Sequence, residues 1–330
     1  MATISQIATE AQVSRALVSR VLNNKPGVSP ANRKKIQAII AKHNYVPNAI
    51  ARSLVTQKTK TIGVVMDSLC DSYFFDLISG MQNMAEELDY NIIFCSGSND
   101  SNIKGKYIDY YAQGRADGLI AFGSRSPNLF AEIIRKAKHF VIIEGDIPAA
   151  VFNKVQVNNF KGAYLATKHL IELGYTDIVH FSGDMDYSVS AERLNGFTAA
   201  MNEYSLLKDD SIIYSGFGEE KAYHQMKDLI KKNTIPEACF VGADKAAFGI
   251  IRAMTEHDLK APDDMAIIGF DEDLPDSRDM VFPKLTTMRQ PLFEMGKEAV
   301  RLLVHSIEDP QAIPATIVFE AEMVVGDTCK

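Results

Sequence analysis

From residue 61 onward, short apolar runs rich in β-branched residues alternate with stretches of helical periodicity. Residues 61–67 read TIGVVMD and residues 90–97 read YNIIFCSG. Helical stretches follow each of them, at about 74–88 and 102–113. Strands that alternate with helices in this way pair in parallel, because each crossover helix returns the chain to the same end of the sheet. The pattern therefore predicts a doubly wound parallel sheet with helices on both faces.

The same rhythm begins again after Lys154. Five further apolar runs alternate with helices, namely KVQVNN, TDIVHFSG, SIIYSGF, EACFVGAD and MAIIGFDE. We therefore predict two similar lobes, about 61–153 and about 154–285, with the C-terminal part crossing back between them. Ligands of open α/β sheets bind beyond the carboxyl ends of the strands. Two such lobes facing each other form a cleft that a ligand can close.

The first 60 residues differ from the remainder in charge. They carry ten Lys and Arg residues and one acid, Glu10, which gives a formal charge of +9. The remainder carries 25 basic and 41 acidic residues, which gives −16. A basic segment joined to an acidic body is typical of a nucleic-acid-binding module attached to another domain.

Capping residues divide the basic segment into three helices. Thr3 and Gln6 fit a capping box for a first helix that ends near residue 11. Ser14 caps a second helix, and Ser29-Pro30 begins a third that ends near Asn44. Two short helices joined by a tight turn and followed by a third indicate a helix-turn-helix, whose second helix enters the major groove of DNA.

The outward residues of the second helix suit contact with DNA. Arg15 and Arg20 can each donate a forked pair of hydrogen bonds to a guanine edge, and the Ala16 methyl can contact thymine. Short hydrogen-bonding groups suited to phosphates or base edges follow at Ser19, Asn23 and Asn24. The alternative is a solvated amphipathic helix in a plain three-helix bundle.

A second feature of the basic segment favours DNA over that alternative. Residues 45–63 read YVPNAIARSLVTQKTKTIG, in which Pro47-Asn48 can begin a helix of two turns. A helix this short is not stable alone in water. Leu54 lies among small residues and is followed by Lys58. This pattern is expected if the segment becomes ordered on DNA and inserts the leucine between base pairs in the minor groove.

The two stretches TISQIATEAQVSRALVSRVLNN and VSPANRKKIQAIIAKHNYVPNAIARSL resemble the headpiece and hinge helix of the lactose-repressor/galactose-repressor family of bacterial transcription regulators. Downstream, ERLNGF, DKAAFGIIRAM and IIGFDED resemble the family's effector-binding core, itself similar to periplasmic sugar-binding proteins. The resemblance implies an all-α helix-turn-helix headpiece at 1–46, a hinge helix and linker at 47–60, and an α/β periplasmic-binding-protein-like core of two doubly wound parallel-sheet lobes at 61–330.

The resemblance also carries candidate DNA contacts onto this chain. The base-reading positions of the family fall on Arg15, Ala16 and Arg20, and its minor-groove leucine falls on Leu54. With the capping residues and the neighbours of Leu54, the full candidate set is Thr3, Ser14, Arg15, Ala16, Ser19, Arg20, Asn23, Asn24, Ala51, Arg52 and Leu54.

Polar and aromatic residues that end the strands of the core are the candidate effector contacts. They suit the hydroxyls and the apolar face of a sugar, and they comprise Asp67, Tyr73, Phe74, Ser124, Glu144, Asn158, Asn159, Arg193, Asp244 and Asp271. The alternative for each of these residues is helix capping or hydrogen bonding within a loop, which Asp and Asn commonly provide after strands. The resemblance implies that Arg193, Asp244 and Asp271 contact the effector, with Phe74 stacking on it and Asn158 or Asn159 assisting.

Three positions depart from the pattern of the family and leave the identity of the effector open. Asn158 stands where members often have aspartate. The residues Glu144-Gly145-Asp146 replace a common Asp-Arg pair, and Tyr73 stands where proline is frequent.

Other classes of protein fit the sequence less well. No run of about 18 apolar residues and no secretory signal is present, so we expect a cytoplasmic protein without membrane association. The cysteines are scattered, and there is no metal-binding spacing, dinucleotide-binding loop or P-loop. We therefore expect no cofactor and no enzymatic activity. A secreted sugar-binding protein without a DNA role is the remaining rival, which the basic segment opposes.

The sequence therefore predicts a DNA-binding transcriptional regulator, a repressor of sugar-utilisation genes, controlled by a small-molecule effector. A helix-turn-helix protein reads half-sites, so we expect a homodimer on a pseudo-palindromic operator. No leucine heptads follow residue 320 to build a tetramer. A phosphoprotein corepressor, and whether the effector releases or promotes DNA binding, are left open.

Replacement of Leu54 tests the modular arrangement. We expect Leu54→Ala to weaken operator binding strongly and to leave effector affinity nearly unchanged, because the leucine acts only in the minor groove. Fluorescence anisotropy on operator DNA and calorimetry with the effector would measure the two affinities. Equal losses of both would contradict separate DNA-binding and effector-binding modules.

Overall fold

The computed structural model describes residues 2–45, 58–69, 71–97, 101–123, 127–145, 151–275, 281–309 and 311–330, with the backbone alone at 101, 102 and 127–131. The chain forms two compact units, Met1–Thr59 and Lys60–Lys330. Each unit has a hydrophobic core of its own.

The described part of the first unit forms three helices, α1 (Ile4–Ala11), α2 (Arg15–Leu22) and α3 (Pro30–Lys42). The predicted caps are confirmed, because Thr3, Ser14 and Ser29 each accept a hydrogen bond from the amide three residues on, and Thr3 with Gln6 completes a capping box. The third helix ends two residues before the predicted Asn44. A small core centred on the fully buried Ile7, Val18 and Ile36 joins the helices.

The second unit contains two six-stranded sheets, each the centre of a lobe. The first sheet has the order β11-β5-β4-β3-β1-β2, and all its strand pairs are parallel. Its strands are β1 (Thr61–Met66), β2 (Asn91–Ser96), β3 (Gly118–Phe122), β4 (Phe140–Ile143), β5 (Asn153–Val157) and β11 (Thr316–Phe319). The helical segments of this first lobe are η1 (Ser72–Phe74), α5 (Phe75–Glu87), α6 (Ser101–Tyr110), η2 (Tyr111–Arg115), α7 (Pro127–Lys136) and α12 (Leu292–Glu308).

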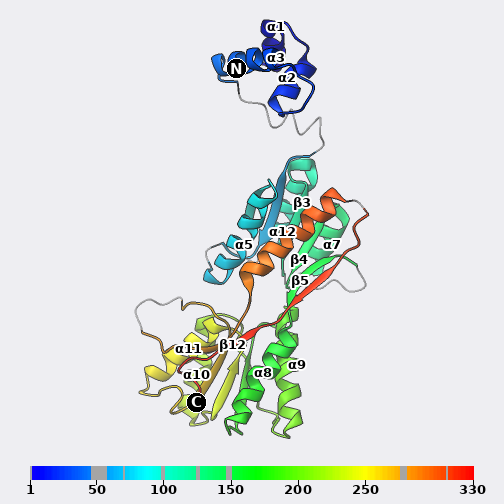
Figure 1. Ribbon diagram of the computed structural model, residues 1–330. Coiled ribbons are helices and arrows are strands. Elements are labelled where there is room, and N and C mark those ends of the chain that lie inside the picture. The colour runs from blue at the N-terminus through cyan, green and yellow to red at the C-terminus, as the bar shows by residue number, and fades with distance from the viewer. Residues whose placement is uncertain are drawn as a thin grey trace. The chain divides into compact units, whose positions relative to one another are not determined.

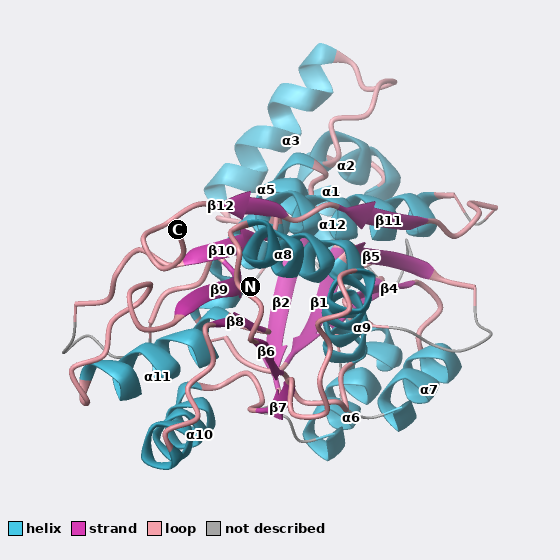
Figure 2. Cartoon of the chain, turned by 90° about the horizontal axis from the view of Figure 1, so that it is seen from below, coloured by secondary structure: helices cyan, strands magenta, loops and turns pink. Residues whose placement is uncertain are grey.

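The second sheet has the order β12-β10-β9-β8-β6-β7, in which only β12 is antiparallel to its neighbour. Its strands are β6 (Ile178–Ser182), β7 (Ile212–Tyr214), β8 (Ala238–Val241), β9 (Ala266–Asp271), β10 (Thr286–Arg289) and β12 (Glu322–Val324). The helices of this second lobe are α8 (Asn159–Glu172), α9 (Ser188–Glu203), α10 (Glu219–Lys232) and α11 (Asp244–Thr255). Figure 2 shows the helices arranged around the strands.

The chain passes between the lobes three times. It crosses between β5 and α8, between β10 and α12, and between β11 and β12. Figure 1 shows α12 beside α5 in the first lobe, and the red C-terminal segment running from there into the second lobe. The predicted return of the C-terminal part is therefore present, and it contributes a helix and a strand to the first lobe.

The predicted boundary between the lobes at residue 153 is misplaced. The run that begins at Lys154 forms β5, which pairs with β4 and β11 in the first sheet and does not open the second. An apolar run predicts that a strand forms, but it does not show with which other strands that strand pairs. The second lobe begins at α8 instead.

Two glycines allow α5 and α12 to pack with their backbones in contact. A Cβ atom added at Gly80 would lie 1.9 Å from the carbonyl oxygen of Phe293 on α12. One added at Gly296 would lie 2.2 Å from the carbonyl oxygen of Leu77 on α5. Since backbone atoms cannot move aside as a side-chain tip can, any larger residue would force the helices apart.

A matched pair of glycine substitutions tests this contact. Alanine gains up to about 1 kcal/mol over glycine inside a helix, but at Gly80 the clash with α12 outweighs that gain. We expect Gly80→Ala to lower the free energy of unfolding by about 1–3 kcal/mol, measured by urea denaturation. Gly105→Ala on α6 is the control, because its Cβ meets only the flexible end of Glu132, at 3.1 Å. Equal stability of the two variants would contradict the close packing.

Candidate functional site

The exposed face of α2 presents the candidate DNA contacts. Arg15, Ala16 and Arg20 are exposed, while Val18 and Val21 on the opposite side are buried in the core of the first unit. Their exposure follows from the helical period, because the apolar residues fix which side of α2 packs inward. The guanidinium groups of Arg15 and Arg20 are thus available to a partner.

The remaining described candidates of the first unit have local structural partners. The Thr3 and Ser14 hydroxyls cap α1 and α2. Asn23 Nδ2 donates to the Ser19 carbonyl at 2.9 Å, and Asn24 Oδ1 accepts from Arg33 Nη1 at 3.0 Å. Asn24 thereby ties the end of α2 to α3. Candidates Ala51, Arg52 and Leu54 lie outside the described residues.

A cavity of about 550 Å³ lies between the two lobes of the second unit. Six of the predicted effector contacts line it, namely Asp67, Tyr73, Phe74, Glu144, Arg193 and Asp271. The parallel sheets explain this convergence, because residues that follow the carboxyl ends of parallel strands gather at one edge.

Arg193 of α9 is buried, with 4% of its surface exposed. Its Nε donates to Asn159 Oδ1 at 2.8 Å and its Nη1 donates to the Gly242 carbonyl at 2.5 Å. Nη1 also lies 3.4 Å from Asp271 Oδ1, and the guanidinium carbon lies 3.8 Å from the centre of the Phe270 ring. These contacts fix the orientation of the guanidinium before any ligand arrives.

Glu144 connects this network to the first lobe. Its Oε1 accepts from the Val157 amide at 2.6 Å and its Oε2 accepts from Asn159 Nδ2 at 3.0 Å. Burial raises the pKa of the Glu144 carboxyl to about 7, although these hydrogen bonds and Arg193 oppose the rise. Asn159 thus joins Glu144 of the first lobe to Arg193 of the second.

Gln290, at the crossover between β10 and α12, forms a second link between the lobes. Its Nε2 donates to Asp271 Oδ1 at 2.6 Å, and its Oε1 accepts from the Tyr73 hydroxyl at 3.4 Å. Burial raises the pKa of Asp271 well above its ordinary value, while Arg193 opposes the rise. Asp271 is therefore held between the guanidinium and an amide.

Three predicted effector contacts do not line the cavity, and a fourth, Ser124, lies outside the described residues. Asn159 is fully buried behind Glu144 and Arg193. Asp244 accepts hydrogen bonds from the Thr287 hydroxyl at 2.7 Å and the Asp273 amide at 2.9 Å, and burial raises its pKa to about 7. Asn158 caps α8 through the Lys161 amide, at 3.1 Å. Asn158 thus has the capping role that was its alternative.

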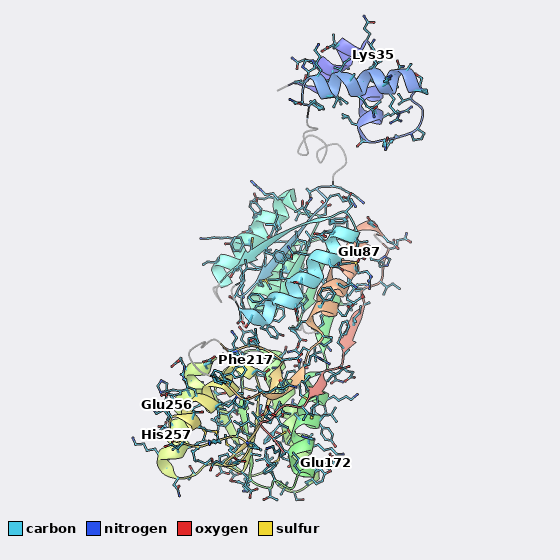
Figure 3. The ribbon with its side chains drawn as sticks, turned by 60° about the vertical axis from the view of Figure 1, so that its left-hand side comes forward. Lys35, Glu87, Glu172, Phe217, Glu256 and His257 are labelled. Carbon is cyan, nitrogen blue, oxygen red and sulfur yellow. The ribbon has the colours of Figure 1, made fainter. Side chains whose placement is uncertain are left out.

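Aromatic rings wall the cavity on both sides. In the first lobe the Phe74 ring packs edge-on against Tyr73 and Phe122, with 5.0 Å between centroids in each pair. In the second lobe Tyr187 packs against Phe217 at 5.5 Å. Figure 3 shows the labelled Phe217 at the side of the second lobe that faces the first.

Three polar bridges join the lobes beside the cavity. Lys245 Nζ lies 2.9 Å from Asp71 Oδ1, and the Ser72 hydroxyl donates to Asp273 Oδ1 at 2.6 Å. The Tyr187 hydroxyl donates to Asp67 Oδ2 at 3.2 Å. Asp67 also pairs with the buried Lys104 of the first lobe. A change in how the lobes close would therefore alter all three bridges.

Eleven further residues line the cavity and were not predicted from the sequence. Most of them follow the carboxyl end of a strand, so the rule for open α/β sheets could have found them. They are Ser68, Asp71, Phe122, Asp184, Tyr187, Val189, Phe217, Gly218, Ala243, Lys245 and Asp273.

Comparison with known proteins identifies the family. Residues 3–48 match the bacterial regulatory proteins of the lacI family, and residues 167–329 match the periplasmic binding protein-like domain. The HTH-type transcriptional repressor PurR of Actinobacillus pleuropneumoniae is 32% identical over 329 residues, which cover 98% of this chain and 97% of that protein. The chain belongs to the LacI family. It is a DNA-binding transcriptional regulator, and its relatives are regulators rather than enzymes, as the sequence predicted.

Solved structures share the fold of this LacI-family chain. The lac repressor dimer bound to operator and the anti-inducer ONPF matches with a TM-score of 0.87 and 22% identity, covering 99% of this chain and 98% of that one. A complex of the transcriptional regulator CelR with cellobiose matches with a TM-score of 0.75 and 24% identity, covering 99% and 100%. Among the residues described for this chain, no helix is long and apolar enough to cross a membrane.

Substitution of Glu144 tests its buried state through pH. The folded-state pKa of about 7 exceeds the ordinary value of 4.5, so the folded protein binds more protons than the unfolded chain between these values. The contribution of Glu144 to stability is therefore present below about pH 4.5 and is lost as pH rises through 7. We expect the free energy of unfolding of the wild type to fall between pH 5 and 8. In Glu144→Gln this fall should be smaller, by up to about 3 kcal/mol.

Urea denaturation at several pH values would measure this difference. Asp244 contributes with the same sign but remains in both proteins, so the comparison isolates Glu144. Glu172→Gln, on the exposed end of α8, is the matched control. An identical pH dependence in wild type and Glu144→Gln would contradict a raised pKa.

Proposed function

We propose that this LacI-family regulator is a repressor, acts as a homodimer on a pseudo-palindromic operator, and is controlled by a sugar bound between its lobes. The observation that carries the proposal is the cavity itself, in which a fixed guanidinium and a buried carboxylate, Arg193 and Asp271, lie between aromatic walls. A regulator that acts on DNA in this way works in the cytoplasm.

The lining of the cavity suits a polyol. Carboxylates accept hydrogen bonds from hydroxyls, the Arg193 guanidinium donates to them, and Phe74 and Phe217 offer faces for the C–H surface of a sugar ring. The cavity volume lies within the range of about 300–1,000 Å³ typical of sites that enclose small molecules. The cellobiose complex of CelR, a protein of the same fold, supports a saccharide as the ligand class.

The DNA-binding half of the proposal rests on α2 and on charge. Arg15 and Arg20 are exposed on this helix together with the Ala16 methyl. Each forked arginine–guanine contact contributes about 1–3 kcal/mol of discrimination. The first 60 residues add a formal charge of +9 that attracts phosphates. Because one such helix reads a half-site, two copies are needed for a palindrome.

Control by the effector follows from the bridges between the lobes. A sugar in the cavity would contact both lobes, so its binding free energy would depend on how far the lobes are closed. Closure would be transmitted to the segment containing Ala51, Arg52 and Leu54, which we propose orders on DNA. A coupling free energy of about 1–3 kcal/mol between the two sites is sufficient for such control.

Replacement of Arg193 tests the effector site. We expect Arg193→Ala to abolish the response of operator binding to sugar while affinity for DNA alone survives, because the first unit has its own core. Arg193→Lys keeps the charge but loses the forked geometry, so it should also lose the response and shows that the effect is not misfolding. Arg135→Ala, exposed on α7, is the control.

The measurement begins with operator DNA selected from a random pool and a thermal-shift screen of sugars. A ligand at a hundred times its dissociation constant adds roughly 2.7 kcal/mol to the stability of the unit that binds it. Anisotropy with and without the sugar found then reports the response of each variant. A folded Arg193 variant that still responds to the sugar would exclude the cavity as the control site.

A further inference from the structure

We infer that the cavity between the lobes accepts an uncharged saccharide and excludes phosphorylated or carboxylated forms of the same sugar. This inference rests on the proposed sugar-controlled function and names the charge class of the effector. It concerns a choice that matters inside a cell, where sugars occur both free and as phosphates.

Carboxylates outnumber cationic side chains in the described lining of the cavity. Six of them face two cationic side chains, Arg193 and Lys245. Three carboxylates come from each lobe, so a ligand meets them on either side. They are Asp67, Asp71, Glu144, Asp184, Asp271 and Asp273.

Both cations of the lining already face carboxylates. Lys245 Nζ lies 2.9 Å from Asp71 Oδ1 and 4.0 Å from Asp273 Oδ2. Arg193 Nη1 lies 3.4 Å from Asp271 and donates to the Gly242 carbonyl. An anionic ligand would therefore have to compete with the protein's own carboxylates for contact with Arg193 and Lys245.

The balance of charge stays negative when the neighbouring groups are included. Lys104 pairs with Asp67 from behind, which makes three cations against six carboxylates. Burial raises the pKa of Glu144, of Asp271 and of Asp273, while the Ser72 hydroxyl and Lys245 oppose the rise at Asp273. With Glu144 and Asp271 protonated, four carboxylates still face three cations among the described residues.

Helix N-termini are the strongest feature that would favour an anion. The N-caps of α9, α10 and α11 are Tyr187, Gly218 and Ala243, which all line the cavity and make no capping bond through a side chain. Acidic residues in the first turns of α10 and α11 already offset their positive ends. Only α9 lacks one, and its terminus contributes roughly half a unit charge. That is too little to make the net charge of the lining positive.

The rest of the lining favours an uncharged ring. Phe74 and Phe122 on one side and Phe217 on the other provide apolar surface. A phosphate carries a charge of about −1.5 to −2 at pH 7, and between partly buried carboxylates salt screens that charge less than at an exposed surface. Hydroxyl groups, in contrast, can donate hydrogen bonds to the same carboxylates without repulsion.

Calorimetry on the full-length protein with matched sugars tests the inference. Glucose, cellobiose and maltose would each be compared with the corresponding 6-phosphate or 6′-phosphate. Like charges in contact cost enough that we expect the phosphate to bind at least about 100-fold more weakly in every pair whose free sugar binds. A phosphate that binds as tightly as its free sugar would overturn the inference and leave sugar control standing.

A variant pair assigns the selectivity to the cavity. Asp184→Asn removes one carboxylate of the lining. It should therefore reduce the ratio between the dissociation constants of the phosphorylated and the free sugar roughly tenfold. Asp209→Asn removes the same charge from an exposed position after α9 and should leave the ratio unchanged. Equal narrowing by both variants would attribute the selectivity to net charge and overturn the role of the cavity.

The same titrations separate this inference from the function on which it rests. Binding of a free sugar but not of its phosphate supports both. If a broad panel of free and phosphorylated sugars gives no heat and no thermal shift, while operator DNA is still bound, sugar control itself fails and the inference fails with it.

Discussion

The burial of one arginine organises the two-lobed second unit. An unpaired buried guanidinium would be strongly destabilising, so its partners must be positioned by the fold. Arg193 finds them on three elements, through Asn159 at the start of α8, Gly242 after β8 and Asp271 at the end of β9. Asn159 then holds Glu144 of the other lobe. Side chains of the cavity and the contacts that join the lobes therefore belong to one hydrogen-bonded network.

The carboxylates beside the cavity have two roles. Asp67, Asp71 and Asp273 form the bridges that hold the lobes together, and they also line the space between the lobes. A ligand that replaces a bridge must supply hydrogen bonds to these carboxylates in exchange, which a hydroxyl can donate and an ionised phosphate cannot. The proposed selectivity for charge and the proposed response to closure thus depend on the same side chains. Two of the three crossings of the chain pass through this network, at Asn159 and at Gln290.

The DNA-binding unit achieves its order by different means. Its core is small and centres on Ile7, Val18 and Ile36, so local interactions at helix ends matter more. Each of its three helices begins at a hydroxyl cap, whereas the three helices that begin at the cavity have none. Side-chain caps stabilise the helices of the small first unit. The three helices that begin at the cavity are stabilised instead by burial against the sheets and neighbouring helices. The opposite charges of the two units complete the separation of tasks.

The sequence by itself determined what depends on neighbouring residues. The caps at Thr3, Ser14 and Ser29, the apolar runs of strands such as β1, β2 and β5 to β9, and the basic face of α2 all follow from patterns a few residues long, whereas β10, β11 and β12 were not predicted. The tertiary structure decided what depends on distant pairing. It placed β5 in the first sheet, moved Asn159 and Asp244 behind the cavity and brought Tyr187, Phe217 and Lys245 to its wall. The Ser72–Asp273 bridge spans 201 residues. No local pattern encodes such a contact, because it exists only once both sheets have formed and the chain has crossed between them.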